Sequence, residues 1–202
     1  MSSLIDFDRK MLKQGTCIAG LDEAGRGALA GPVFVGCIVV PGEVLMDSEM
    51  MDRVNDSKQL SEVSREELFA GLSENEKIEI GLGQADNREI DDVGINEAAK
   101  RAATRAFNSC STPVNLLLLD GGLGVESEPA CETLEKGDEK SFHVAAASIL
   151  AKVARDRYMR SRAADFPGYG WKTNVGYGTE EHRQAVRGNG LTPLHRKSYN
   201  IR

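Results

Sequence analysis

The sequence lacks the features that mark membrane, secreted and zinc-binding proteins. Its longest nearly apolar run, residues 28–40, is too short to span a bilayer and contains glycine and proline. The N-terminal residues have no apolar stretch behind a basic start, so they do not resemble a signal peptide. The cysteines lie far apart, with no C-x-x-C pair: Cys17, Cys37, Cys110 and Cys131. We therefore expect a cytoplasmic protein without membrane contact, whose cysteines are buried free thiols.

Motifs of several common enzyme classes are missing as well. No G-x-x-x-x-G-K-[ST] sequence is present, which excludes a P-loop nucleoside triphosphatase, and no G-x-S-x-G sequence marks a nucleophilic serine. A loose glycine pattern runs from Gly25 to Gly31, but Pro32 and a Val/Ile run follow it, whereas a dinucleotide-binding fingerprint opens a helix. The histidines are few and are interpreted as structural hydrogen-bonding residues: His143, His182 and His195.

Length and composition are those of one globular domain. The chain has 202 residues, of which 41% are hydrophobic and 28% charged, which is ample for a buried core and excludes a disordered chain. The net charge of −6 is divided unevenly, with −14 on residues 1–139 and +8 on residues 140–202. A basic C-terminal third suggests a partner that carries phosphates, but on charge alone a solvated basic helix face is the better interpretation.

Apolar stretches of β type predict strands at residues 16–21, 32–40, 77–84 and 114–119. In the third stretch, Ile78, Ile80 and Leu82 alternate with other residues, so we expect them to face the core. The fourth is almost entirely apolar and ends in a turn signal at residues 120–122, which is typical of a central strand covered on both faces. The glycine-rich segment 22–31 is predicted to join the first two strands as a compact turn.

Apolar residues at helical spacing predict helices, one beginning at Ser61 and the others covering residues 95–107, 143–162 and 179–187. Thr179 is the expected N-cap of the last helix, and Gly188 is expected to follow its final residue. No repeat and no linker divides the chain. The order of elements predicts a mixed-sheet α/β domain with an irregular C-terminal piece.

Acidic residues stand where the predicted strands end. Asp22 and Glu23 follow the first strand, Asp120 follows the apolar strand, and Asp138 lies just before the long helix. Converging carboxylates repel one another, and a hard divalent cation such as Mg²⁺ or Mn²⁺ removes that conflict. Spacing alone leaves open, and favours, the simpler interpretation that these are turn and cap residues.

Two further observations bear on these acids. Neighbouring residues of a strand point to opposite faces, so Asp22 and Glu23 can share a site only if the strand bends, which the nearby glycines allow. Asp156 competes with Asp138 as the fourth acid. However, Lys152, Asp156 and Arg160 follow one another at i, i+4 and i+8 of the long helix, and an exposed row of ion pairs explains Asp156 without chemistry.

Six sequence blocks, in this order, are similar to those of one enzyme family. They are GLDEAGRGALAGPV (20–33), DSKQLS (56–61), LLLLDG (116–121), KGDEKSFHVAAASILAKVARDRYM (136–159), GYGTEEH (176–182) and GLTPLHRKSY (190–199). Together they make the chain resemble ribonuclease HII, of the RNase H-like superfamily, over roughly residues 16–200.

The resemblance implies an α/β fold with an RNase H-like mixed central β-sheet flanked by α-helices and an irregular, partly helical C-terminal extension. It implies a single catalytic domain, residues 1–202, with residues 163–202 as a basic substrate-binding extension. The implied enzyme hydrolyses the RNA strand of RNA/DNA hybrids and cuts 5′ to single ribonucleotides embedded in duplex DNA. It leaves 3′-hydroxyl and 5′-phosphate ends, serves ribonucleotide and RNA-primer removal, and acts as a monomer without an obligate protein partner.

The resemblance also assigns roles to individual residues. Two Mn²⁺ or Mg²⁺ ions would be held by the catalytic acids Asp22, Glu23, Asp120 and Asp138. The substrate-binding residues would be Gly25, Arg26, Gly27, Lys58 and Tyr177. The glycine loop would read the ribose 2′-hydroxyl with backbone groups, Tyr177 would pack on the sugar at the DNA–RNA junction, and Lys58 would contact a phosphate.

One departure and three alternatives accompany the resemblance. Family members often carry lysine before the Gly-Tyr pair, whereas this chain has Val175, which puts one phosphate contact in doubt. Another metal-dependent nuclease of the same fold, such as a DNA-junction resolvase, would lack a use for the glycine loop and Tyr177. A small-molecule phosphatase does not need the basic C-terminal third. A non-catalytic nucleic-acid binding module would gain nothing from four acids near phosphates.

Overall fold

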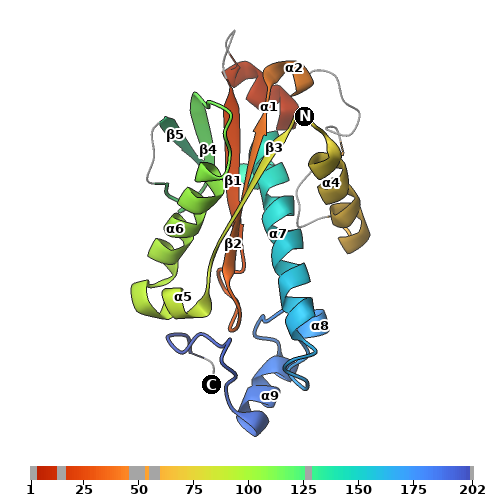
Figure 1. The fold of residues 1–202 in the computed structure, drawn as a ribbon, viewed down its shortest axis with the longest axis vertical. Coiled ribbons are helices and arrows are strands. Elements are labelled where there is room, and N and C mark those ends of the chain that lie inside the picture. Colours follow the sequence, from red (N-terminus) through yellow and green to blue (C-terminus); the bar gives the residue numbers. More distant parts are fainter. Residues whose placement is uncertain (1–3, 13–16, 46–52, 55–59, 126–128, 201–202) are drawn as a thin grey trace.

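The computed structural model of the chain describes residues 4–12, 17–45, 53–54, 60–125 and 129–200 (Figure 1). Lys58 and most of the DSKQLS block lie outside these residues, so the predicted phosphate contact of Lys58 has no structural counterpart here.

A mixed sheet of five strands forms the centre of the described fold, in the order β3-β2-β1-β4-β5. The strands are β1 (Ile18–Ala24), β2 (Val33–Val40), β3 (Glu79–Ala85), β4 (Leu116–Asp120) and β5 (Ala130–Leu134). The first three pair antiparallel, and β4 runs parallel to both β1 and β5. This arrangement confirms the predicted mixed-sheet α/β architecture.

Helices cover both faces of the sheet (Figure 1). The helices are α1 (Leu4–Met11), α2 (Gly42–Leu45), α4 (Glu62–Glu74), α5 (Asn87–Val93), α6 (Ile95–Asn108), α7 (Phe142–Arg162), α8 (Trp171–Asn174) and α9 (Glu180–Asn189). The alanines of α6 pack on one face with the inward side chains of β1, β2 and β4. On the other face α7 shares a core with β2, α4 and α1.

Helix α7 lies directly on the sheet because glycine faces it. A Cβ atom on Gly20 of β1 would stand 2.3 Å from the backbone of His143, and one on Gly36 of β2 would stand 2.3 Å from the carbonyl oxygen of Ala147. Both distances are too short for any side chain. The glycines therefore set the close approach of α7, whose N-terminus is capped by the Ser141 side chain accepting from the Val144 N–H.

The prediction that β3 buries its large side chains is wrong for Leu82, which is 40% exposed. The opposite face of β3 is the one buried against α6. There, Cβ atoms on Gly81 and Gly83 would stand 2.1 and 2.0 Å from the carbonyl oxygens of Ala106 and Ala102. The period of two is correct, but a glycine face lets an alanine-rich helix approach more closely than a leucine face would.

The C-terminal piece, with α8 and α9, packs against the end of α7 and the segment that joins β1 to β2 (Figure 1). Thr179 caps α9 as predicted, with its side chain accepting from the His182 N–H. The helix runs on to Asn189, however, and Gly190, at φ 79°, replaces Gly188 as the residue that ends it. Gly190 can take this left-handed conformation without steric cost.

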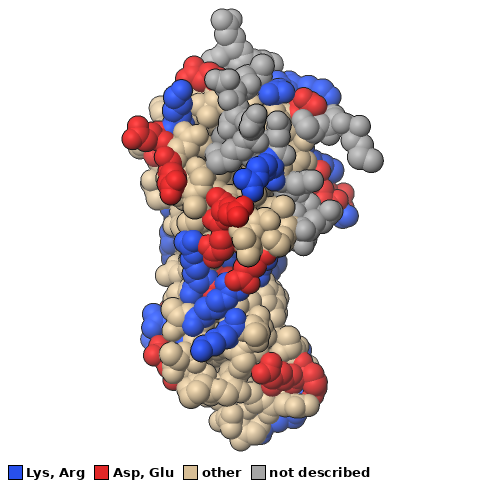
Figure 2. Space-filling view, turned by 90° about the vertical axis from the view of Figure 1, so that its right-hand side faces the viewer, with Lys and Arg blue, Asp and Glu red and all other residues tan. Residues whose placement is uncertain are grey.

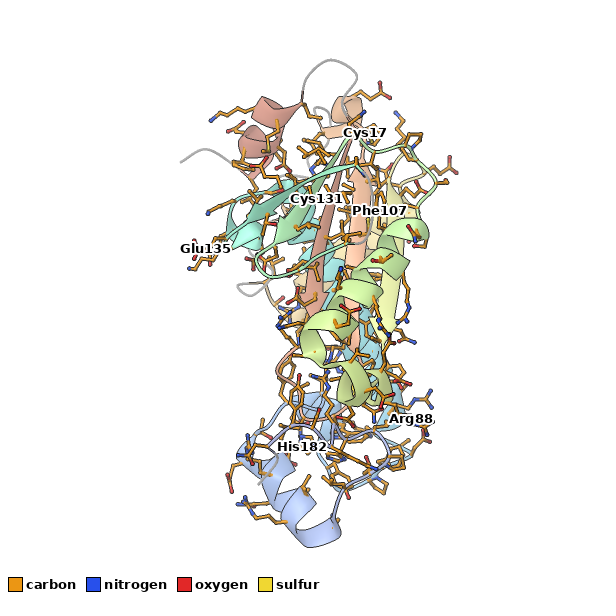
Figure 3. The ribbon with its side chains drawn as sticks, turned by 90° about the vertical axis from the view of Figure 1, so that its left-hand side faces the viewer. Cys17, Arg88, Phe107, Cys131, Glu135 and His182 are labelled. Carbon is orange, nitrogen blue, oxygen red and sulfur yellow. The ribbon has the colours of Figure 1, made fainter. Side chains whose placement is uncertain are left out.

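The histidines are structural, as predicted. His182, at the C-terminal end of the molecule in Figure 3, accepts from the Trp171 indole N–H at 3.1 Å, and its Nε2 lies 3.1 Å from that of His195. His143 is fully buried, and its Nδ1 lies 2.7 Å from a carboxylate oxygen of Asp8 in α1. All three rings serve packing and hydrogen bonding within the fold.

The cysteines are free thiols, as predicted, but they are not all buried. Cys37 is buried, Cys17 and Cys110 are half-buried, and Cys131 is exposed on the edge strand β5 (Figure 3). An edge strand with a solvent-facing side exposes whatever residue stands there. In the part of the chain that the structure describes, no helix is both long and apolar enough to cross a membrane.

Candidate active site

The strand register brings two of the predicted acids together. Strand β1 continues beyond the predicted end at residue 21 to Ala24. Its parallel ladder with β4 ends at the pair Leu21–Leu119. Asp22 and Asp120 are therefore the next residues of two neighbouring strands, at the point where the strands cease to pair. The end of this ladder is where an α/β sheet offers room for a site.

A cavity of about 510 Å³ opens at this end of the sheet. Its lining includes most of the residues predicted for the site: Asp22, Glu23, Gly25, Arg26, Gly27, Asp120 and Tyr177. Arg65, Ser148 and Lys152 also line it, and the sequence analysis did not single them out as site residues. Arg65 comes from α4 and the other two from α7, so two further elements contribute side chains around the acids.

Burial and mutual repulsion oppose the ionised form of these acids. Asp22 is only 6% exposed, and its burial raises its pKa well above the usual value. The charges of Glu23 and Asp120 raise this pKa further, whereas a hydrogen bond with Ser148 lowers it. Burial also raises the pKa of Glu23, although Arg26, 3.2 Å away, favours its charged form. Such a site gains from a bound cation.

Asp22 and Glu23 reach the same cavity without the bend that the sequence analysis required. Strand β1 stays in register with β2 through Ala24, so the strand is not interrupted at the acids. Beyond Leu21 the other side of β1 has no strand partner, and side chains from both faces can reach this open edge. The Asp22 side chain also bonds to the backbone of its own strand, where its Oδ1 accepts from the Glu23 N–H at 2.7 Å.

Asp138 stands behind this group. It lies in a 3₁₀ turn (Gly137–Glu139), is 1% exposed, and is not part of the cavity lining. The turn is nevertheless tied to the site, because the Gly137 N–H donates to Asp120 Oδ1 at 2.7 Å. Within the described ranges, no group of three or more His, Cys, Asp or Glu side chains is arranged to hold a metal ion. The four-acid metal site therefore stays a prediction.

The rival fourth acid, Asp156, has the partners predicted for it. Its carboxylate lies 2.9 Å from Lys152 Nζ and 3.9 Å from an Arg160 nitrogen. The expectation of an exposed row is wrong, since Asp156 is only 6% exposed. Helix α4 packs beside this stretch of α7 and covers it.

One carboxylate oxygen supports the fit of this cavity to a divalent cation. Glu23 Oε2 is buried, and no hydrogen-bond donor reaches it from the described part of the chain. A buried carboxylate oxygen without a donor is costly unless something positive meets it. Hard oxygen ligands with raised pKa values around one cavity suit Mg²⁺ or Mn²⁺.

The glycines of the loop differ in what surrounds them. Gly25 has φ 94°, and a Cβ there would stand 1.9 Å from Arg155 Nε, so the fold itself requires glycine. Gly27 has no atom within 4 Å of the place where a Cβ would stand. The fold leaves this space open on the cavity wall.

Tyr177 is half-buried, and two basic side chains make cation–π contacts with its ring. Arg155 Cζ lies 4.9 Å and Lys152 Nζ 5.5 Å from the ring centroid. Val175, two residues earlier, is 5% exposed and packs in the apolar cluster of the C-terminal piece. Its φ of 42° is a rare conformation for a β-branched residue. The side chain at 175 thus serves packing and does not extend to a ligand.

The basic C-terminal third is not a continuous positive surface. Arg155 and Arg196 are fully buried and bind backbone carbonyls of the loop between β1 and β2. Several others pair with acids: Arg157 with Glu66, Arg160 with Glu62, Arg162 with Asp165 and Arg187 with Glu180. Figure 2, which views the side of the molecule that carries α4 and α7, shows basic and acidic side chains interleaved there. The +8 balance therefore overstates the charge that is available to a nucleic acid.

Sequence reasoning missed both buried arginines as functional residues. Each lies within a block that carries the family resemblance, 136–159 for Arg155 and 190–199 for Arg196. Nothing in a linear pattern distinguishes an arginine that points inward from one that faces solvent, so the charge count treated them alike.

The mixed sheet, its flanking helices and the acids at the ends of β1 and β4 define an RNase H-like protein. Comparison with known proteins agrees. The ribonuclease H2 of Pyrococcus horikoshii OT3 superposes with a TM-score of 0.76 at 27% identity, covering 92% of this chain and 95% of that one. The RNase HII in a PCNA complex from Archaeoglobus fulgidus gives 0.71 at 25% identity, covering 92% and 96%. Bst-RNase HIII in complex with Mn²⁺ shares the fold, with a TM-score of 0.67 at 17% identity, covering 92% and 68%.

Sequence comparison narrows the class to one family. Residues 19–201 match the family described as Ribonuclease HII. A ribonuclease HII from Leuconostoc mesenteroides is 42% identical over 198 residues, which cover 98% of this chain and 76% of the relative. One from Caldanaerobacter subterraneus is 40% identical over 195 residues, covering 96% and 78%. The chain belongs to the ribonuclease HII family, and it is an RNase H type II endonuclease, a hydrolase that acts on RNA/DNA hybrids. Divalent metal dependence is general for this family.

Proposed function

We propose that the enzyme cuts 5′ to single ribonucleotides embedded in duplex DNA, as well as within the RNA strand of hybrids, and leaves 3′-hydroxyl and 5′-phosphate ends. The observation that carries this proposal is one cavity in which Asp22, Glu23 and Asp120 lie beside the loop from Gly25 to Gly27. Carboxylates for phosphodiester chemistry and backbone groups for sugar recognition are thus within reach of one nucleotide. Its role would be the removal of ribonucleotides and RNA primers from DNA, in the cytoplasm and as a monomer.

Asp22, Glu23, Asp120 and Asp138 would hold two Mg²⁺ or Mn²⁺ ions. When bound, such ions activate the attacking water and stabilise the departing 3′-oxygen of a phosphodiester. The raised pKa values of Asp22 and Glu23 and the unsatisfied Glu23 Oε2 support this assignment. Asp120 would also keep the Gly137 turn in place through its 2.7 Å bond, and so bring Asp138 up to the site.

The remaining lining residues would bind and orient the strand. Lys152 and Arg65 are cations on the wall that also carries the acids, and each would contact a phosphate oxygen next to the cut. The open space at Gly27 would admit the ribose close to the backbone. Tyr177 would pack its ring on the neighbouring sugar, held in place by Arg155. Residues 163–202 would form the substrate-binding extension, in which Lys172 and Lys197 carry charge toward the duplex.

The decisive experiment uses a labelled DNA duplex that contains one ribonucleotide, with an all-DNA duplex of the same sequence as control. We expect a single cut 5′ to the ribonucleotide with Mn²⁺ or Mg²⁺, no cut with chelator, and no cut in the control. Cleavage of the all-DNA control would point to a general nuclease instead. A protein that cuts long hybrids but never the lone ribonucleotide would contradict the proposed substrate range.

Metal binding is expected to stabilise the folded enzyme even without substrate. A ligand at about a hundred times its dissociation constant contributes about 2.7 kcal/mol, which raises the melting temperature of a domain this size by about 5–10 °C. Thermal unfolding with added Mn²⁺ measures this shift. In Asp22→Asn the shift should largely disappear, because one carboxylate of the site is lost. An equal shift in that variant would place the ion elsewhere.

A further inference from the structure

The loop between β1 and β2 is held from beneath by the guanidinium of Arg196. This side chain is fully buried, and within the described ranges no carboxylate pairs with it. Its Nε donates to the Gly31 carbonyl at 3.0 Å, its Nη1 to Arg26 at 2.8 Å and its Nη2 to Gly25 at 2.7 Å. Burying a charge without a counter-charge is costly, so each of these bonds is needed to offset it. The rigid fork of arginine supplies three donors at this spacing, and lysine does not.

Tyr199 completes this support. Its hydroxyl donates to the Arg26 carbonyl at 2.7 Å and accepts from Arg196 Nη1 at 3.1 Å. The Arg26 carbonyl thus receives two donors, from residues that lie some 170 positions away in the sequence. The backbone adds a further hydrogen bond to the loop, because the Arg196 N–H donates to the Leu29 carbonyl oxygen at 2.9 Å.

Holding these carbonyls fixes the direction of two N–H groups. In a planar trans peptide the carbonyl of one residue and the N–H of the next point in opposite directions. Since the Gly25 and Arg26 carbonyls point at Arg196, the N–H groups of Arg26 and Gly27 point away from it. No hydrogen bond among the described residues uses either N–H group. Both residues line the cavity that holds the acids, and the space at Gly27 is open.

We propose that Arg196 and Tyr199 are positioning residues that aim the Arg26 and Gly27 N–H groups at the ribose 2′-hydroxyl, so that this C-terminal pair sets the discrimination between ribose and deoxyribose. The inference rests on the proposed role of the loop in reading the sugar. It gives Arg196 a task that differs from gripping phosphates, since its guanidinium does not reach solvent.

The test compares ribose discrimination in Tyr199→Phe, Arg196→Lys and the wild type. Two labelled duplexes of one sequence, with and without a single ribonucleotide, are bound in chelator so that no cleavage occurs, and the ratio of their dissociation constants is measured. Tyr169→Phe is the matched control, because its hydroxyl donates to Gly190 in the same C-terminal piece and not to the loop.

We expect Tyr199→Phe to lower the discrimination ratio about threefold to tenfold, which is the effect of one hydrogen bond, with affinity for all-DNA duplex unchanged. Arg196→Lys should lower it further, and Tyr169→Phe should keep the wild-type ratio. If Arg196→Lys does not fold, the comparison of Tyr199→Phe with Tyr169→Phe still tests the inference. An unchanged ratio in Tyr199→Phe, or an equal loss of affinity for both duplexes, overturns the inference.

The outcomes separate this inference from the proposed function. If the wild type cuts at a lone ribonucleotide and discriminates in binding, while Tyr199→Phe discriminates equally well, only the role of the pair fails. If the wild type neither cuts there nor discriminates, the proposed function fails and the inference fails with it.

Discussion

Replacing Asp120 with asparagine is expected to reduce cleavage about a thousandfold or more while the protein stays folded. The asparagine carbonyl can still accept the Gly137 N–H that now bonds to Asp120 Oδ1, so the turn before α7 keeps its anchor. What is lost is one negative charge beside Asp22 and Glu23, where cations must bind for the chemistry. Single-turnover cleavage at a lone ribonucleotide, together with thermal unfolding, measures both halves of the prediction.

Two matched variants make this experiment decisive. Asp138→Asn should lose activity nearly as severely, because Asp138 is the proposed fourth acid. Asp156→Asn makes the same chemical change in an acid that does not line the cavity and that pairs with Lys152 and Arg160, and should lose less than about fivefold. Full activity in Asp120→Asn would remove Asp120 from the site. A severe loss in Asp156→Asn with normal activity in Asp138→Asn would exchange the two acids.

The second large effect is expected at Gly27. Alanine there meets no protein atom within 4 Å and needs no positive φ, so the melting temperature should stay within about 1–2 °C of the wild type. The added methyl group enters the space that we assign to the ribose. A displacement of the sugar by about 1 Å from the acids costs about a hundredfold in rate, and we expect a loss of that size.

Gly25→Ala is the opposing control. Its methyl group would collide with Arg155 Nε at 1.9 Å, in a backbone conformation of φ 94° that alanine disfavours. We expect a loss of stability of about 2–5 kcal/mol, seen in denaturant unfolding. The two substitutions should therefore have different effects: Gly25→Ala should mainly lower stability, and Gly27→Ala should mainly lower activity. A stable, slow Gly25→Ala together with an active Gly27→Ala would reverse this assignment.

Most regular elements could be predicted, because strong local patterns specify them. The apolar runs at β2 and β4 and the spacing along α6 and α7 match the structure to within a few residues. Strand β5 was missed because four of its five residues are exposed, so its sequence carries no alternation. It becomes a strand by pairing with β4. Helix α5 was missed although its N-cap, Asp86, bonds to the Glu89 N–H three residues later, a signal that the sequence does contain.

By itself the sequence determined most of the strand and helix segments, the acids at the strand ends and, through six ordered blocks, the family. Only the tertiary structure decided which of these residues meet. Asp22 and Asp120 become neighbours through the β1–β4 register, and Arg155 and Arg196 turn inward to hold the loop instead of facing a duplex. The physical reason is that local pattern reports the conformation of a segment and its apolar face. Contacts between residues up to 171 positions apart depend on how the packed layers align.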